Sequence, residues 1–265
     1  RRRGSSVAEA RSAGAAVRTP LAGALTDACR STTIDSMDAE WSADTRRRAA
    51  LHGLLADPAR VAIVDLLAWS DASPSELGAR LGLASNLLAH HVGVLARHGI
   101  VRRHRSEGDR RRTYLALVPG ALDGVGAAGP ARPAPSRVVF VCTANSARSQ
   151  LAAAAWQRVS PLPTASAGTH PAERVASGAL RAARRHRLPP LGEPRSLGDV
   201  LVDGDYVITV CDRAHEEAPG LAAGHWSVPD PVRRGDEDAF EAALAQIERR
   251  VADLAPRFTG PATTG

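Results

Sequence analysis

The sequence lacks lysine altogether and has only three cysteines among its 265 residues. Cys29, Cys142 and Cys211 are too few and too far apart for a disulfide framework, and no Cys-x-x-Cys pair indicates a zinc site. The sequence has no apolar run of about 18 residues, the length needed to span a bilayer. Its N-terminal residues do not have the pattern of an export signal. We therefore expect a cytoplasmic protein without bound metal or membrane association, in which each cysteine is a single thiol.

All 34 basic residues are arginine, as in a chain shaped by coding bias, so an isolated arginine carries little information. Their distribution is more informative. Residues 43–118 contain 12 arginines against 7 acidic residues, a net charge of +5, whereas residues 136–259 contain 15 of each. A basic first half beside a neutral second half predicts a polyanionic partner for the first half alone.

The composition predicts two folded domains and two irregular segments. Residues 1–42 are mostly small residues and arginine, without apolar periodicity over most of their length, which indicates a disordered extension or an over-extended gene start. Residues 119–136 form a linker rich in proline, glycine and alanine. The folded domains are then expected at residues 43–118 and 137–259.

The first domain has the pattern of four short helices followed by a hairpin. Asp57-Pro58 supplies an N-cap with proline at the first helical position, Gly82 ends the third helix, and Ser85 is expected to cap the fourth. The expected helices are residues 44–56, 58–69, 73–81 and 86–99, and strands at 100–105 and 112–117 flank the charged turn SEGD. This order predicts an α+β winged helix-turn-helix.

A winged helix-turn-helix places its second helix in the major groove of double-stranded DNA, with the first residues of that helix toward the base edges. The candidates for base contact are Ser85, Asn86 and Ala89, with His90 further along the helix. The arginines expected to neutralise backbone phosphate are Arg102, Arg103, Arg105, Arg110, Arg111 and Arg112. A solvated basic surface is the alternative, but the position of the hairpin directly after two such helices favours DNA contact.

Three stretches of this domain resemble the arsenic-repressor (ArsR) family of dimeric winged-helix regulators: LADPARVAIVDLLAW, SELGARLGLASNLLAHHVGVLARHGIV and RRTYLAL. The resemblance implies a homodimer, formed through this domain, that binds an operator and regulates arsenic resistance genes. The segment WSDASPSELG has no cysteine where the family often carries an arsenic-binding pair. The resemblance therefore leaves open whether this domain senses arsenite.

The second domain alternates strands and helices, which predicts an α/β domain with a four-stranded parallel sheet flanked by helices. Strands are expected at 137–142, 164–167, 205–211 and 225–228, and helices at 148–159, 171–186 and 236–255. Ligands of such sheets bind at the carboxyl ends of the strands. Cys142 and Cys211 both lie at such ends.

The motif VCTANSARSQ places a cysteine at the end of a strand and an arginine six residues later, where a helix begins. A helix N-terminus stabilises a thiolate, and the loop between Cys142 and Arg148 can turn its N–H groups around a tetrahedral oxyanion. Arg148 would hold two oxygens of that anion. The substrate-binding candidates are Thr143, Ala144, Asn145, Ser146, Ala147 and Ser149. A buried cysteine followed by a turn is the alternative, but the whole pattern favours a nucleophile.

Each of the two polar residues singled out in this motif has a specific expected role. Asn145 tolerates the left-handed backbone conformation that such a loop needs, and Ser149 can donate a hydrogen bond to the thiolate. On these residues and on SAGTHP, YVITVC and WSVPDP, the domain resembles the low molecular weight tyrosine phosphatase superfamily and its thiol-linked arsenate reductases. The resemblance implies catalysis by Cys142 and Arg148 without a bound cofactor, and Asp230 as the general acid.

Reductase and phosphatase differ in the second step, in which either another thiol or water attacks the cysteine adduct. Gln150, where the phosphatases usually carry proline, the second thiol Cys211 and the fused regulator favour an arsenate reductase. Ala218 replaces the third cysteine of the thioredoxin-linked reductases. The resolving thiol is therefore Cys211 or an external reductant, either thioredoxin or mycothiol or glutathione with a glutaredoxin-like protein. A tyrosine phosphatase fused to a regulator, or a non-catalytic oxyanion sensor, are the alternatives.

Overall fold

The computed structural model describes residues 41–259, except for residue 124 and residues 126–131. Apart from Trp41 and Ser42, the segment expected to be disordered or an over-extended gene start lies outside the described residues, and so does Cys29. The described residues from Asp44 onward belong to one compact unit. Both expected domains fall within this unit, so their contacts can be described together.

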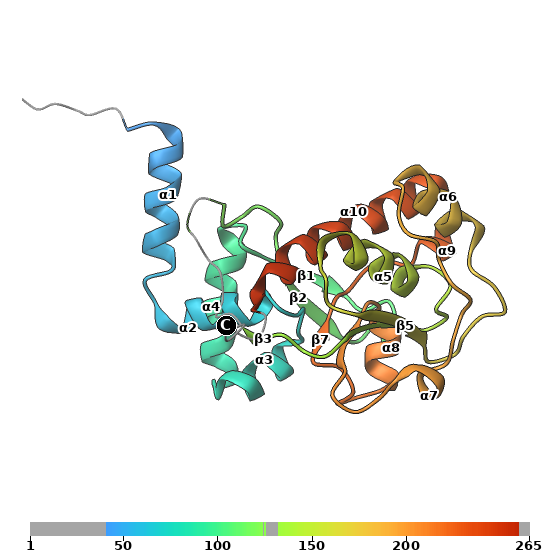
Figure 1. The fold of residues 1–265 in the computed structure, drawn as a ribbon. Coiled ribbons are helices and arrows are strands. Elements are labelled where there is room, and N and C mark those ends of the chain that lie inside the picture. Colours follow the sequence, from blue (N-terminus) through green and yellow to red (C-terminus); the bar gives the residue numbers. More distant parts are fainter. Residues whose placement is uncertain (1–40, 124, 126–131, 260–265) are drawn as a thin grey trace, which may run out of the picture. The chain divides into compact units, whose positions relative to one another are not determined.

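The first domain folds as four helices and a two-stranded antiparallel hairpin (Figure 1). The elements are α1 (Ala43–Leu54), α2 (Pro58–Leu67), α3 (Pro74–Leu81), α4 (Ser85–Arg97), β1 (Val101–Arg105) and β2 (Thr113–Leu117). Asp57 caps α2 by accepting hydrogen bonds from two backbone N–H groups, and Gly82 ends α3 with a φ of 64°. Ser73 and Glu76 form a reciprocal capping box at the start of α3. Local sequence signals thus set the ends of α2 and α3.

The expectation that Ser85 caps the fourth helix is wrong. Ala84 occupies the N-cap position, with no side-chain hydrogen bond, and Ser85 is already helical. Leu88, Val92 and Leu95 are buried on one face of α4, as the apolar spacing predicted. They pack into a hydrophobic core of the first domain that also contains residues of α2 and β2. The opposite face of α4 is therefore presented to solvent.

The second domain is built on a four-stranded parallel sheet in the order β5-β4-β6-β7, which confirms the predicted fold class. The strands are β4 (Val138–Cys142), β5 (Thr164–Gly168), β6 (Tyr206–Thr209) and β7 (Gly224–His225). The helices are α5 (Arg148–Val159), α6 (Ser177–Arg185), α7 (Leu197–Val200), α8 (Asp212–Glu217), α9 (Pro231–Arg234) and α10 (Glu237–Leu254). The short strands β3 (Arg132–Pro133) and β8 (Phe258–Thr259) pair in parallel beside this sheet.

Several elements differ from the sequence prediction, among them the strand expected at 225–228, which is Gly224–His225. The helix expected from residue 171 begins at Ser177. The strand expected to reach residue 211 ends at Thr209, because Cys211 caps α8. The short helices α7, α8 and α9 were not predicted, since four to six residues carry too little periodicity to be recognised.

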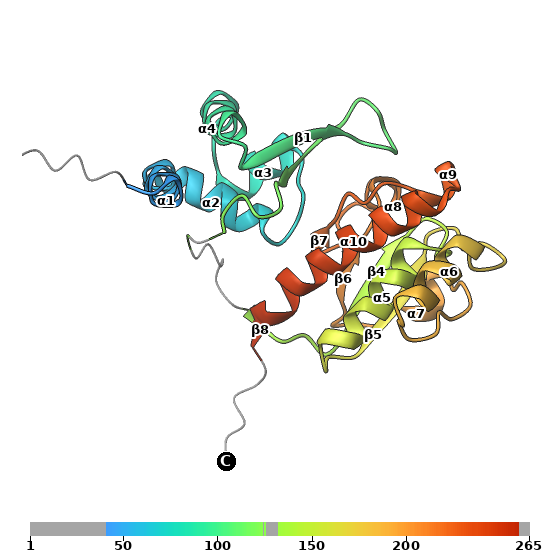
Figure 2. The same ribbon diagram turned by 90° about the horizontal axis from the view of Figure 1, so that it is seen from above.

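The central strand β4 is buried along its whole length, and this fixes the position of the residue at its carboxyl end. Helix α5 is buried from Arg148 to Trp156, and α10 runs alongside it (Figure 2). The rings of Phe140, Trp156 and Trp226 pack together in this core. Cys142 is therefore held by a well-packed core at the carboxyl end of the central strand.

Residues 70–72 of the first domain join the two domains at β7. The Asp71 N–H donates to the His225 carbonyl at 2.7 Å, and the His225 N–H donates to Ser70 Oγ at 2.9 Å. The Asp71 carboxylate accepts from the Ser227 N–H and forms a salt bridge with Arg250 of α10. The edge of the sheet is thus covered by backbone and side-chain hydrogen bonds from the first domain.

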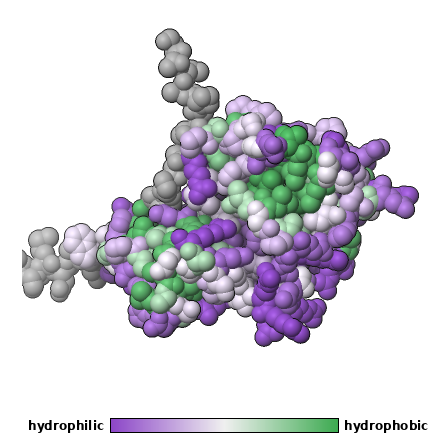
Figure 3. All heavy atoms as spheres, turned by 90° about the horizontal axis from the view of Figure 1, so that it is seen from below, coloured by the Kyte–Doolittle hydropathy of each residue, from purple (hydrophilic) through white to green (hydrophobic). Residues whose placement is uncertain are grey.

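The surface is mixed in character. Figure 3 shows one face, on which hydrophilic residues predominate around more limited hydrophobic patches. Among the described residues, no helix is both long and apolar enough to cross a membrane.

Candidate active site

The loop between β4 and α5 wraps around the sulfur of Cys142. Asn145 adopts a left-handed conformation with a φ of 48°, and its N–H donates to Cys142 Sγ at 3.2 Å. Ser149 Oγ lies 3.0 Å from the same sulfur and accepts a hydrogen bond from Asn145 Nδ2 at 2.8 Å. Because the Ser149 oxygen already accepts this bond, its own proton is free to point at the sulfur. Two hydrogen-bond donors therefore lie within reach of the Cys142 sulfur.

A buried amide network holds this loop from behind. The side-chain oxygen Oδ1 of Asn145 accepts from the Arg195 N–H at 2.9 Å and from Gln150 Nε2 at 3.3 Å. Gln150 in turn donates to the Glu193 carbonyl and accepts from the Gly192 N–H. Asn145 and Gln150 are both buried. Gln150, singled out from its place in the motif, therefore acts in the structure as a brace between the loop and residues 192–195.

Gly168 at the end of β5 allows the loop to approach the sheet closely. A Cβ atom at this position would lie 2.7 Å from the Thr143 carbonyl oxygen and 3.0 Å from the Asn145 nitrogen. The next residues, Thr169 and His170, donate backbone hydrogen bonds to the carbonyls of Cys142 and Thr143. Only glycine fits here without displacing the loop.

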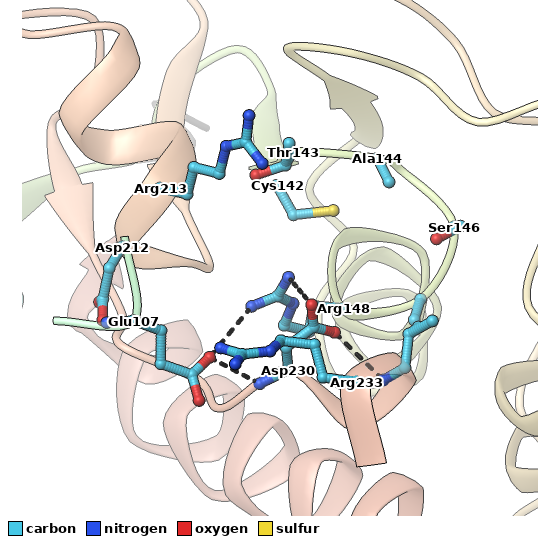
Figure 4. A pocket seen from close by; sticks show the side chains of 12 residues that line it. Glu107, Cys142, Thr143, Ala144, Ser146, Arg148, Asp212, Arg213, Asp230 and Arg233 are labelled. Carbon is cyan, nitrogen blue, oxygen red and sulfur yellow. Dashed lines mark hydrogen bonds and ion pairs between the residues drawn. The ribbon is translucent and has the colours of Figure 1, made fainter. Parts of the chain in front are cut away.

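A pocket of about 400 Å³ opens above Cys142 (Figure 4). Its lining residues are Glu107, Cys142, Thr143, Ala144, Ser146, Ala147, Arg148, Asp212, Arg213, Asp230, Val232 and Arg233. Two of the substrate-binding candidates, Asn145 and Ser149, are not among these residues; both are fully buried and support the loop instead. The described pocket is therefore lined by the loop, by the starts of α8 and α9, and by one residue of the hairpin.

Arg148 is buried and faces several acceptors in this pocket. Its Nη1 donates to the Val228 carbonyl at 3.1 Å, and its Nη2 lies 3.3 Å from Asp230 Oδ2. Burial disfavours the charged guanidinium, but the thiols and carboxylates around it outweigh burial and raise the pKa of Arg148. Asp230 also caps α9, with Oδ1 accepting from the Val232 N–H. The arrangement presents a fixed positive charge and a carboxyl group to an anion above the sulfur.

Cys211 lies two residues after the neighbouring strand β6, at the N-cap of α8, and is buried. Its sulfur is 3.4 Å from Thr143 Oγ1 and accepts from the Ala214 N–H at the start of α8. Burial raises the pKa of the Cys211 thiol, despite the nearby charge of Arg148. Cys211 is not one of the described residues that line the pocket. It touches the loop without opening onto the anion position.

The DNA-binding candidates lie on exposed surface. Ser85, Asn86, Ala89 and His90 are exposed on the first turns of α4, whereas the adjacent His91 is buried. The six arginines of the hairpin are also exposed: Arg102, Arg103, Arg105, Arg110, Arg111 and Arg112. The structure thus brings together the residues predicted around Cys142 and leaves those predicted for DNA exposed, with Arg110, Arg111 and Arg112 on the hairpin turn that contacts α8 and α9.

Sequence reasoning missed Glu107, the residue that the hairpin contributes to the pocket. The hairpin turn at residues 106–112, here called the wing tip, contacts α8 and α9. The charged turn was recognised, but no spacing in the sequence indicates that it meets residues more than one hundred positions away. A site residue from the other domain could be found only in the folded structure.

Two family models match the chain. Residues 137–260 match the model for low molecular weight phosphotyrosine protein phosphatase, and residues 55–104 match a helix-turn-helix domain. No curated protein matches the chain.

Solved structures that resemble the chain include an arsenate reductase from Archaeoglobus fulgidus, with 29% identity over 45% of this chain and 98% of that one and a TM-score of 0.41. The Erwinia amylovora tyrosine phosphatase AmsI has 19% identity, covering 48% and 95% of the two chains with a TM-score of 0.42. The YwlE arginine phosphatase from Geobacillus stearothermophilus has 21% identity, with coverage of 46% and 92% and a TM-score of 0.38. From the family models, the chain carries a helix-turn-helix domain followed by a domain of the low molecular weight phosphotyrosine protein phosphatase superfamily.

Proposed function

We propose that the second domain reduces arsenate to arsenite with thiols as reductant. The observation that carries the proposal is the character of the pocket wall: among the described residues that line it, none is aromatic, and most are charged or small. An aryl phosphate gains much of its binding energy from apolar and aromatic contacts with its ring. A pocket with this lining suits a small inorganic oxyanion better.

The first step forms a bond between sulfur and arsenic. The Cys142 thiolate, supported by the Asn145 N–H and the Ser149 hydroxyl, attacks the arsenic of arsenate. Arg148 balances the charge on the oxygens, and Asp230 donates a proton to the oxygen that leaves as water. The product is a thioester of arsenic(V) on Cys142.

The second step transfers the electrons. A second thiolate attacks Cys142 Sγ, a sulfur–sulfur bond forms, and the sulfur–arsenic bond breaks with its electron pair left on arsenic. Arsenic(V) becomes arsenic(III) and leaves as arsenite, while two thiols become one disulfide. A further reductant then restores the Cys142 thiol, so no resident cofactor takes part.

We propose that the second thiol comes from an external reductant. Cys211 is buried, its pKa is raised by burial, and its sulfur contacts Thr143 rather than the pocket. A raised pKa lowers the thiolate fraction that can attack. Thioredoxin, or mycothiol or glutathione with a glutaredoxin-like protein, would instead approach through the open side of the pocket.

For the first domain we propose operator binding as a homodimer that controls arsenic resistance genes. Support comes from the helix-turn-helix match, the exposed first turn of α4 and the exposed arginines of the hairpin. A salt titration tests this role, because each phosphate contact adds about 0.9 to the slope of log affinity against log salt. Loss of one hairpin arginine should lower that slope by about one unit.

The experiment for the second domain compares substrates and reductants on the full chain. Arsenite production is measured with thioredoxin, mycothiol and glutathione systems, beside hydrolysis of an aryl phosphate. We expect arsenate-dependent arsenite production with at least one of the three. Rapid aryl phosphate hydrolysis without arsenite production would favour the phosphatase, and binding of oxyanions without either reaction would favour the sensor.

A further inference from the structure

The wing tip delivers one carboxylate into the anion pocket. Glu107 Oε2 accepts a hydrogen bond from the Asp230 N–H at 2.9 Å and lies 3.9 Å from Arg148 Nη1 (Figure 4). Every other lining residue belongs to the second domain. Glu107 thus adds a negative charge beside the group that holds the anion and the group that donates the proton.

The wing tip is held in this position by several contacts with α8. Ser106 Oγ donates to Glu216 at 2.6 Å, the Asp109 N–H donates to the same carboxylate at 2.6 Å, and the Glu107 N–H donates to Asp212 at 2.8 Å. Gly108 lies so close to α8 that an added Cβ would meet the Glu216 carboxylate and come within 3.0 Å of the Arg213 backbone. The wing tip that carries Glu107 is therefore fixed against α8 by hydrogen bonds and close packing.

We propose that Glu107 is a specificity-determining residue, which admits inorganic oxyanions to the pocket and rejects phosphate monoesters with a bulky or anionic substituent. This inference rests on the proposed function, because it names the feature that selects arsenate at that site. It also assigns a part of the wing to the substrate pocket instead of to DNA.

The selection follows from where a substituent must leave the pocket. In the proposed reaction the loop and Arg148 would surround three oxygens of the tetrahedral anion, and the fourth oxygen would point toward Asp230, the proton donor. Glu107 accepts a hydrogen bond from the Asp230 N–H, so its carboxylate would lie beside that fourth oxygen. In arsenate this oxygen carries a proton that can be donated to the Glu107 carboxylate. In a monoester it carries a carbon chain or ring, which would desolvate the carboxylate without offering a hydrogen bond.

The test measures kcat/KM for arsenate, para-nitrophenyl phosphate and a phosphotyrosine peptide in the full chain. In Glu107→Ala we expect the ratio of aryl phosphate to arsenate activity to rise on the order of tenfold, equivalent to about 1.4 kcal/mol. Glu107→Gln keeps the size of the side chain but removes its charge, so it separates the effect of the negative charge from the effect of the side chain's bulk. Gly108→Ala, which pushes the wing tip off α8, should raise the same ratio.

Asp109→Asn is the matched control, because it removes a negative charge from the same wing tip at a residue that does not line the pocket. Its ratio should stay within about twofold of the wild type, as expected for an exposed charge. An unchanged ratio in both Glu107 variants would overturn the inference, and so would an equal rise in Asp109→Asn.

Binding measurements distinguish a failure of this inference from a failure of the proposed function. If the wild type makes no arsenite, the proposed reductase fails, but binding of inorganic phosphate and of phenylphosphonate can still be compared by calorimetry. Glu107→Ala should then tighten phenylphosphonate relative to phosphate. If arsenite is made and this preference does not move, the reductase stands and the role of Glu107 is refuted.

Discussion

Replacing Arg250 with methionine should destabilise the whole described unit, because it removes the partner of a fully buried carboxylate. The side chain of Asp71 is 0% exposed, and both of its oxygens contact Arg250 Nη2, at 2.5 and 2.7 Å. The pair links the first domain to α10, next to the hydrogen bonds that cover β7. Its loss would leave Asp71 with the Ser227 N–H as its remaining donor.

The magnitude follows from the burial of the pair. Removing one partner of a buried ion pair costs about 3–5 kcal/mol. Arg250 is 16% exposed and the Ser227 N–H remains, so the lower end, about 3 kcal/mol, applies here. In a unit of this size each kcal/mol shifts Tm by about 2–4 °C, which gives a fall of about 6–12 °C.

The assay is thermal unfolding followed by circular dichroism, on the wild type, Arg250→Met, Asp71→Asn and the double variant. Asp71→Asn removes the buried charge, so the double variant should be more stable than Arg250→Met alone, with a coupling of about 1–3 kcal/mol. A Tm loss below about 2 °C in Arg250→Met, or a double variant less stable than Arg250→Met, would show that the buried Asp71–Arg250 pair does not stabilise the fold.

Three further predictions concern the site and its surroundings. Gly168→Ala should displace the Cys142 loop and weaken the inhibition of arsenate reduction by phosphate on the order of tenfold. Gly198→Ala, where an added Cβ has space, should leave this inhibition unchanged. Burial raises the pKa of Glu76, but hydrogen bonds, led by that with His215, outweigh it and lower the pKa from 4.5 to about 2. The stabilisation that comes from this lowered pKa is present above pH 4.5 and is lost as the pH falls toward 2. In chemical denaturation, Glu76→Gln should reduce the acid-dependent change in the free energy of unfolding by about 1–2 kcal/mol. Cys211→Ser should keep arsenite production within about twofold of the wild type if the second thiol is external.

Each of these predictions has an outcome that contradicts it. Unchanged phosphate inhibition in Gly168→Ala would mean that the loop tolerates a methyl group there. An acid unfolding curve of Glu76→Gln that parallels the wild type would show that the hydrogen-bonded Glu76 carboxylate does not stabilise the fold. Loss of arsenite production in Cys211→Ser, with phosphate binding retained, would instead make Cys211 the resolving thiol.

The fold could be predicted largely because its signals are local. The cap at Asp57-Pro58 and the left-handed Gly82 each act within a few residues, and the apolar run before Cys142 marks a fully buried strand. Ser85 shows the limit of such signals. It could cap α4 only if the helix began at the next residue, but the helix begins at Ser85 itself and Ala84 occupies the N-cap position. Local chemistry sets which elements form more reliably than where they begin.

Much of the candidate site was also accessible from the sequence, since the loop from Cys142 to Arg148 is contiguous. The parts that were not accessible depend on contacts between distant segments. Glu107 enters the pocket only because the wing tip packs on α8, and Asp71 is paired only because α10 passes beside residues 70–72. Neither contact has a periodicity or spacing that a single sequence can reveal.

The most direct test of the account is the stoichiometry of arsenite formation in the wild type and in Cys142→Ser. With excess external thiol, the wild type should release one arsenite for each pair of thiols oxidised, and this production should be absent in Cys142→Ser. Phosphate binding in the variant serves as the control for an intact loop. Arsenite production that persists in Cys142→Ser, or thiol oxidation without arsenite in the wild type, would contradict the proposed reduction at this cysteine.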